Sequence, residues 1–212
     1  MYSDGDFVIV IGRQFGSGGK ELGAELSERL GIPCYDKTIL NEAACEIGFR
    51  KEIFSRSDEK KPSLFRSFFN CNPGIATESC ASPSLCADTV YAMQSETISR
   101  LAQRGPCIFV GRTADYILRD HPRMVSIFLH ASRQERIRRI CRRKDASCEK
   151  DACELLARRD KERQNYYEYY TGRKWGDAAT YDLTLNATGI PAPWLAAVVI
   201  SYLNSKAPGR VE

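Results

Sequence analysis

Residues 7–20 read Phe-Val-Ile-Val-Ile-Gly-Arg-Gln-Phe-Gly-Ser-Gly-Gly-Lys, and this stretch decides the fold. Its apolar start predicts a buried strand over residues 7–11, and the helical periodicity of residues 20–30 predicts a helix after a glycine-rich turn. In such a strand–turn–helix unit, backbone N–H groups and the positive end of the helix dipole point at one spot, where an anion binds. We therefore predict a phosphate-binding loop over residues 12–20.

The loop departs from the signature G-x-x-x-x-G-K-[ST], because Gln14 stands six residues before Lys20 and Glu21 occupies the hydroxyl position. Two registers are open. Either Lys20 is the phosphate-binding lysine, or residues 16–18 align with the Gly-Ser-Gly before that lysine and Gly19 replaces it. In the second register Lys20 would swing in, or an arginine elsewhere would supply the charge. A helix packed tightly on its strand without a ligand is the alternative, which the four glycines of residues 12–19 disfavour.

Composition indicates an ordinary globular protein, with 43% hydrophobic residues, 27% charged residues and a net charge of +4. No apolar stretch approaches the roughly 20 residues that cross a bilayer, and Asp4 and Asp6 precede the first apolar run, unlike a signal peptide. We expect a cytoplasmic protein without a membrane partner. The nine cysteines form no Cys-x-x-Cys pair, which disfavours zinc, and His121 and His130 leave little for histidine-based catalysis.

Short continuous apolar runs alternate with helical patterns along the rest of the chain, as in a parallel sheet buried on both faces. We expect an α/β fold of three layers, α/β/α, with a five-stranded parallel sheet. Asp88 is a candidate N-cap, and Gly105 a candidate stop, of the helix between them. Further strands are expected at residues 32–35, 107–110, 124–129 and 183–185. Further helices are expected at residues 37–47, 88–104, 132–144, 149–166 and 193–204.

We predict a single domain over residues 1–212, with two distinct regions inside it. Residues 55–87 are rich in Ser, Pro, Cys and Asn and break the strand–helix pattern. They form a variable insert, either a mobile element that covers the substrate or a partly disordered loop. Residues 132–175 form an Arg-rich helical lid region.

Ligands of open α/β sheets bind at the carboxyl ends of the strands, so residues just after each strand are candidate site residues. Arg112 follows a buried strand directly, and its planar guanidinium suits a phosphate. The alternative is an ion pair with Asp115 or Asp36. Asp36 would accept a hydrogen bond from a substrate or cap a helix that begins at Lys37, and the sequence favours neither.

A block of arginines and lysines occupies residues 133–163. Phosphoryl transfer needs several positive groups around the transferred group, and arginines on a hinged helical hairpin would supply them while excluding water. We expect this role mainly for residues 158–163, rather than for 138–143. The alternative is a solvated helix face paired with nearby acids. Nucleic-acid binding is not expected, because acidic residues interrupt the block and the tyrosines cluster beyond it.

Several motifs in order make the chain resemble the bacterial cytidylate kinase-like proteins. The resemblance covers nearly the whole chain except residues 55–87. The motifs are Gly-Arg-Gln-Phe-Gly-Ser-Gly-Gly (12–19), Ile-Pro-Cys-Tyr-Asp-Lys (32–37), Gly-Arg-Thr-Ala-Asp-Tyr-Ile-Leu (111–118), Ile-Phe-Leu-His-Ala-Ser-Arg-Gln-Glu-Arg-Ile-Arg-Arg (127–139), Arg-Arg-Asp-Lys-Glu-Arg (158–163), Tyr-Thr-Gly-Arg-Lys-Trp-Gly (170–176) and Tyr-Asp-Leu-Thr-Leu-Asn (181–186).

The resemblance implies a P-loop fold of the nucleoside monophosphate kinase type. ATP would lie on residues 13–21, with its base near 186–189. Catalytic roles fall to Lys20, Arg158, Arg159 and Arg163. ATP-binding roles fall to Arg13, Gly16, Ser17, Gly18, Gly19, Lys20 and Glu21. Acceptor-binding roles fall to Asp36, Arg112 and Asp115. Candidate Mg²⁺ ligands are Ser17, Glu21, Asp36 and Asp115, of which Ser17 and Glu21 are the first choices.

The function expected from the sequence is ATP- and Mg²⁺-dependent phosphoryl transfer to a nucleoside monophosphate, CMP first, or to a related small molecule. The alternative is a nucleotide-binding regulatory protein that keeps the fold with a degenerate phosphate loop and little or no kinase activity. The partners expected are nucleotide substrates, and the sequence does not predict the oligomeric state.

Overall fold

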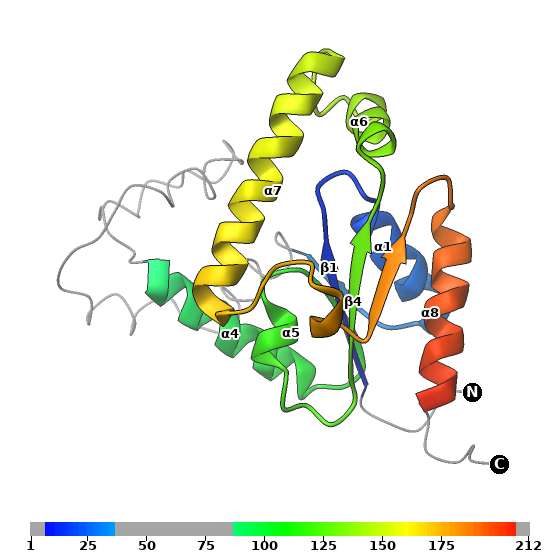
Figure 1. Cartoon of the computed structure of the whole chain (residues 1–212). Helices are drawn as coiled ribbons and strands as arrows, with labels where there is room; N and C mark the ends of the chain where they lie inside the picture. Colours follow the sequence, from blue (N-terminus) through cyan, green and yellow to red (C-terminus); the bar gives the residue numbers. More distant parts are fainter. Residues whose placement is uncertain (1–6, 37–86, 207–212) are drawn as a thin grey trace, which may run out of the picture.

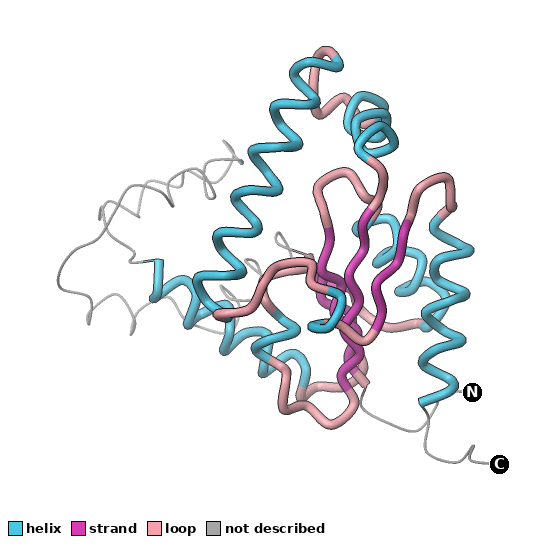
Figure 2. The backbone as a smooth tube through the Cα atoms, viewed as in Figure 1, coloured by secondary structure: helices cyan, strands magenta, loops and turns pink. Residues whose placement is uncertain are grey.

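The computed structural model describes residues 7–36 and 87–206. Five parallel strands form one sheet in the order β2-β3-β1-β4-β5 (Figures 1 and 2). Their bounds are β1 (Val8–Arg13), β2 (Cys34–Tyr35), β3 (Cys107–Val110), β4 (Met124–His130) and β5 (Leu183–Asn186). The predicted five-stranded parallel sheet is confirmed.

Helices lie between the strands, as the sequence predicts. Their bounds are α1 (Gly19–Leu30), α4 (Ala87–Ala102), α5 (Ala114–Ile117), α6 (Arg133–Arg142), α7 (Glu149–Thr171) and α8 (Ala192–Lys206). The helix α4 begins at Ala87, so Asp88 lies in its first turn rather than at the N-cap. The short α5 was not predicted. The expected helix at 37–47 lies outside the described residues, as does the insert at 55–87 except for Ala87.

The sheet carries a hydrophobic core on each face, which explains why its strands are continuously apolar. Ile9 and Ile11 of β1 pack into the core covered by α1 and α8. Val8 and Val10 of the same strand pack into the core that includes residues of α4 and α5. The helices on the two sides of the sheet are visible in Figure 1. The central strand β1 is therefore buried on both faces.

The strand β1 is longer than its apolar run. Gly12 and Arg13 continue the ladder and pair with Phe128 and Leu129 of β4. Arg13 is therefore the last residue of the strand and lies at the carboxyl end of the sheet, where a ligand is expected.

The helices α6 and α7 form a hairpin beyond the carboxyl ends of the strands (Figure 1). Its small core contains Ile137 and Ile140 of α6 with Ala152 and Leu156 of α7, and Phe15 of the phosphate loop packs against this core. The hairpin thus contacts the loop directly. No helix in the described part of the chain is both long enough and apolar enough to cross a membrane.

Candidate active site

A cavity of about 850 Å³ lies between the phosphate loop, the turn after β3 and the α6–α7 hairpin. Its position at the carboxyl ends of β1 and β3 is where ligands of parallel α/β sheets bind. Predicted site residues that line it are Arg13, Gly16, Gly18, Gly19, Lys20, Arg112, Asp115, Arg158, Arg159 and Arg163. The structure therefore brings most of the predicted residues together at one cavity.

The start of α1, where the phosphate loop ends, has the uncapped backbone that an anion site needs. Gly16 and Gly18 have φ angles of 76° and 98°, and Gly18 is the N-cap of α1. No side chain caps α1, so the N–H groups of its first turn have no side-chain acceptor at the helix start. Such N–H groups, with the helix dipole, favour a phosphate.

The loop is packed tightly against α6 at Gly16. A Cβ atom at Gly16 would lie 2.9 Å from the backbone oxygen of Arg136, in addition to the cost of a positive φ for a residue with a side chain. We expect Gly16→Ala to lower the free energy of unfolding by about 1–3 kcal/mol, as measured by denaturant unfolding. Gly31→Ala is the matched control, because Gly31 has a φ of 66° but nothing within 4 Å of its Cβ position. Equal losses in the two variants would contradict the close approach.

Lys20 lies at the rim of the cavity. Its ammonium forms an ion pair of 2.8 Å with Asp36, and 66% of its side chain is exposed. The helix α1 begins one residue earlier, at Gly19. Asp36 therefore pairs with Lys20 in this structure. The helix that Asp36 was expected to cap begins at Lys37, which lies outside the described residues.

Three arginines, Arg13, Arg112 and Arg163, lie close together deep in the cavity wall. Burial lowers the pKa of Arg13 well below its usual range, and the charges of Arg163 and Arg112 lower it further. Burial also lowers the pKa of Arg163 to about 10, with Asp160 opposing this shift. Because like charges are held together at a partly desolvated surface, the cluster favours a bound anion.

The turn after β3 is strained where it presents Arg112. Gly111, Arg112 and Thr113 have φ angles of 81°, 64° and 53°. Two successive residues with side chains in the left-handed region cost free energy, and such strain is typical of functional sites. Burial lowers the pKa of Arg112, whereas Tyr166, through its charge and a hydrogen bond, and the charge of Asp36 oppose that shift. The ion pair of Arg112 with Asp115 that the sequence left open is not formed among the described residues.

Asp160 joins the α6–α7 hairpin to the phosphate loop. Its carboxylate accepts a hydrogen bond of 2.7 Å from the backbone N–H of Phe15 and forms an ion pair with the guanidinium of Arg136. Arg136 also donates to the carbonyl of Phe15. From α7, Arg163 donates to the carbonyl of Arg13 at 3.0 Å. The hairpin and the loop therefore form one hydrogen-bonded unit.

Sequence reasoning did not single out Arg136, Asp160 or Arg139 for this role. Arg139 of α6 donates to the carbonyl of Ser17 and, at 2.9 Å, to that of Ala187. Arg139 belongs to the block of residues 133–163 for which a solvated helix face is the alternative, whereas only 16% of its side chain is exposed. The one signal in the sequence was the position of Arg136 beside the apolar Ile137 in a helix with a buried face.

Asp115 of α5 is one of the acidic residues that line the cavity. It is buried and accepts a hydrogen bond of 2.6 Å from the hydroxyl of Tyr167. Burial raises the pKa of Asp115, while the hydrogen bond from Tyr167 and the charge of Arg173 lower it. A carboxyl group in such a setting is a candidate proton acceptor.

The two metal ligands predicted first, Ser17 and Glu21, do not line the cavity. Ser17 is fully buried, and its hydroxyl donates to the carbonyl of Gln14 at 2.9 Å. Glu21 lies 3.5 Å from the guanidinium of Arg143. Among the residues that the structure describes, no group of three acidic, histidine or cysteine side chains is arranged to hold a metal ion.

Arg158 and Arg159 of α7 line the cavity near its outer part. Arg159 forms an ion pair of 3.2 Å with Glu162, which also lines the cavity.

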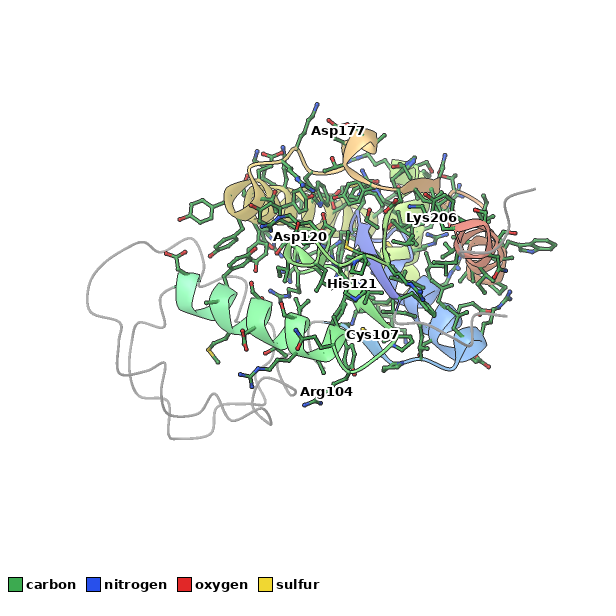
Figure 3. The ribbon with its side chains drawn as sticks, turned by 90° about the horizontal axis from the view of Figure 1, so that it is seen from below. Arg104, Cys107, Asp120, His121, Asp177 and Lys206 are labelled. Carbon is green, nitrogen blue, oxygen red and sulfur yellow. The ribbon has the colours of Figure 1, made fainter. Side chains whose placement is uncertain are left out.

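Figure 3 shows the molecule from below, with His121 among the labelled side chains. His121 precedes β4, so it lies at the amino end of the sheet, opposite the cavity.

Comparison with known proteins agrees with this geometry. A model of the cytidylate kinase-like family matches residues 8–189, which include all five strands and the whole α6–α7 hairpin. The chain belongs to the cytidylate kinase-like family. No curated protein matches it in sequence.

Solved structures show the same fold. A crystal structure of an uncharacterized protein from Eubacterium ventriosum is 26% identical, with a TM-score of 0.71, over 94% of this chain and 99% of that one. Shikimate kinase from Bacteroides thetaiotaomicron is 14% identical, with a TM-score of 0.54, over 93% and 98%. A gluconokinase from Sinorhizobium meliloti is 16% identical, with a TM-score of 0.50, over 95% and 98%. The fold of this chain is therefore one that it shares with these two kinases.

Proposed function

We propose that this member of the family is an ATP-dependent phosphotransferase whose acceptor is a nucleoside monophosphate, with CMP as the first candidate. The observation that carries the proposal is the cluster of Arg13, Arg112 and Arg163 beside the phosphate loop. These residues come from the end of β1, the turn after β3 and α7, and they line one cavity. A transferring phosphoryl group spreads its charge over three oxygens, and converging arginines match that charge.

The reaction is an in-line transfer. The bond between the γ-phosphorus and the oxygen that bridges it to the β-phosphate breaks, and a bond from the γ-phosphorus to an acceptor oxygen forms. ADP leaves with the bridging oxygen. The cavity walls hold donor and acceptor in line and exclude water, which are the main contributions of the protein to such a reaction.

The phosphate loop would hold the phosphates of ATP through its N–H groups, and the arginine cluster would lie between donor and acceptor. In this arrangement Arg163 would contact the phosphoryl group during its transfer. It comes from α7 and reaches the phosphate loop, where it donates to the carbonyl of Arg13. Arg112, from the turn after β3, would face the acceptor. Arg158 and Arg159 would add positive charge at the outer side of the cavity.

Mg²⁺ would enter with ATP. In kinases this ion is held by one or two carboxylates together with phosphate oxygens and water, so a preformed cage of protein ligands is not required. Carboxylates that line the cavity are Asp115, Asp145 and Glu162. They fit an ion that is already bound to phosphate, and the ion would neutralise charge on the β- and γ-phosphates. Ser17 and Glu21 are poorer candidates than these three, because neither of them lines the cavity.

A substitution of Asp115 distinguishes a phosphate acceptor from a hydroxyl acceptor. A phosphate acceptor is ionised at neutral pH and needs no general base, whereas a hydroxyl acceptor needs one. The raised pKa of Asp115 and its place in the cavity suit a base. With a hydroxyl acceptor, Asp115→Asn should abolish phosphoryl transfer, because the general base is lost. With a nucleoside monophosphate no general base is lost, so the decrease should be the smaller one that comes from weaker binding of Mg²⁺ or of the acceptor.

The test is a panel of acceptors incubated with the protein, ATP and Mg²⁺, with ADP as the readout. We expect ADP formation with CMP or another nucleoside monophosphate above the rate with ATP alone. ATP binding without transfer to any acceptor would contradict the proposal. That result would favour a nucleotide-binding regulatory protein. The phosphate loop departs from the usual signature, and this departure is compatible with such a role.

A further inference from the structure

The side chain of Arg13 occupies the space beside the start of α1. A Cβ atom built on Gly19, the first residue of the helix, would lie 2.8 Å from Cγ of Arg13 and 3.1 Å from its Cβ. Gly19 is the residue that stands at the lysine position in one register of the loop. Since Gly19 has no side chain, the aliphatic part of Arg13 lies directly over the helix start.

A second glycine receives the other end of Arg13. A Cβ atom built on Gly111, in the turn after β3, would lie 1.5 Å from Nη1 of Arg13 and 2.6 Å from its Cζ. No side chain fits there while the guanidinium is present. Arg13 therefore runs from Gly19 to Gly111, through space that a side chain at either glycine would share with it, and its guanidinium lies at the cavity wall.

The charge of Arg13 is not neutralised by an ion pair within residues 7–36 and 87–206. Its cationic neighbours are Arg112 and Arg163, and its nearby acidic group is Asp36, whose carboxylate is bound at 2.8 Å by Lys20. An arginine side chain that runs from one glycine to another, with its guanidinium next to two further arginines, is a built site for a multiply charged anion.

We propose that Arg13 does the work of the missing phosphate-loop lysine. It reaches the β- and γ-phosphates from the end of β1, instead of from the first turn of α1. Gly19 and Gly111 keep its path open, and Lys20 is left to pair with Asp36 at the rim. This inference rests on the proposed binding of ATP. It identifies the residue that supplies the positive charge when Gly19 stands at the lysine position of the loop.

The test measures the affinity of the purified protein for ATP and for inorganic tripolyphosphate by titration calorimetry. Arg13→Ala should weaken the binding of both about 10- to 100-fold, the usual range for one hydrogen bond to a charged group. Lys20→Ala should cost less. Arg29→Ala is the matched control. Arg29 lies on α1, as Lys20 does, but it is exposed, is paired with Glu25 and does not line the cavity.

A rescue variant separates this role from a purely structural one. Gly19→Lys alone places a side chain against Arg13 and should weaken binding. In the double variant Arg13→Ala/Gly19→Lys the contact with Cγ of Arg13 is removed, only the Cβ contact at 3.1 Å remains, and the new lysine stands at the helix start. The double variant should therefore bind ATP more tightly than Arg13→Ala. Circular dichroism and thermal melting would show that each variant is folded.

The outcomes are distinct. If Arg13→Ala keeps the affinity of the unaltered protein, or if Lys20→Ala loses more, the inference is wrong and the proposed function stands. If binding depends on Arg13 and no acceptor is phosphorylated, the inference stands and the proposed catalysis fails. If the unaltered protein binds neither ATP nor tripolyphosphate, both are wrong. A folded double variant that binds no better than Arg13→Ala also counts against the inference.

Discussion

Arg163→Ala is expected to lower kcat for phosphoryl transfer by about 100- to 1000-fold, the usual loss for one electrostatic contact that is made in the transition state. Arg163 is the member of the arginine cluster that comes from α7, and it contacts the loop through the carbonyl of Arg13 at 3.0 Å. Its guanidinium lies 5.4 Å from the ring of Phe15, which restricts its orientation. The positive charge is therefore positioned before the substrate arrives.

The measurement is steady-state kinetics with ATP and the acceptor found by the panel. A catalytic role predicts a loss in kcat that exceeds any rise in the KM for ATP. Arg163→Lys should recover part of kcat, since it keeps a charge but not the planar fork. Arg100→Ala, which removes an exposed arginine of α4 paired with Glu96, is the control. A rise in KM for ATP at unchanged kcat would show that Arg163 only binds the nucleotide.

The fold was largely predictable because its strands are short runs of apolar residues between glycines, prolines and polar turns. The runs at 107–110 and 124–129 were placed to within one residue. The end of β1 was not, because Gly12 and Arg13 carry no apolar signal. They belong to the strand only through their pairing with β4. The helix α5 was missed because it is a single turn, entered through the positive φ of Thr113.

The site was predictable where a residue directly follows a strand and unpredictable where contacts cross between elements. Arg112 was found by its position after β3. The side chain of Arg13 lies between Gly19 and Gly111, which come from two other segments of the chain. Their proximity to Arg13 follows from the strand order, which the sequence does not give. Likewise, Arg136 and Asp160 lie on different helices, and no spacing in the sequence pairs them. Their pairing follows from the way in which α6 and α7 pack around a shared core.

Asp160→Ala is expected to lower the free energy of unfolding by about 3–5 kcal/mol, the usual cost of removing one partner of a buried ion pair. Only 8% of the Arg136 side chain and 17% of the Asp160 side chain are exposed. The substitution would leave a buried guanidinium without its carboxylate and the N–H of Phe15 without its acceptor. Denaturant unfolding followed by circular dichroism measures the loss.

The matched control is Asp145→Ala, which removes an aspartate from the same hairpin. Asp145 pairs with Arg143 at 2.7 Å, but 37% and 33% of their side chains are exposed, and a pair of that kind contributes about 0–1 kcal/mol. The double variant Arg136→Met/Asp160→Leu should lose less than Asp160→Ala, because it leaves no unpaired charge. Equal losses for Asp160→Ala and Asp145→Ala would mean that Asp160 does not hold the hairpin on the loop. A large loss for Asp160→Ala alone would mean that the contacts of Asp160 with Arg136 and with the N–H of Phe15 hold the hairpin on the phosphate loop.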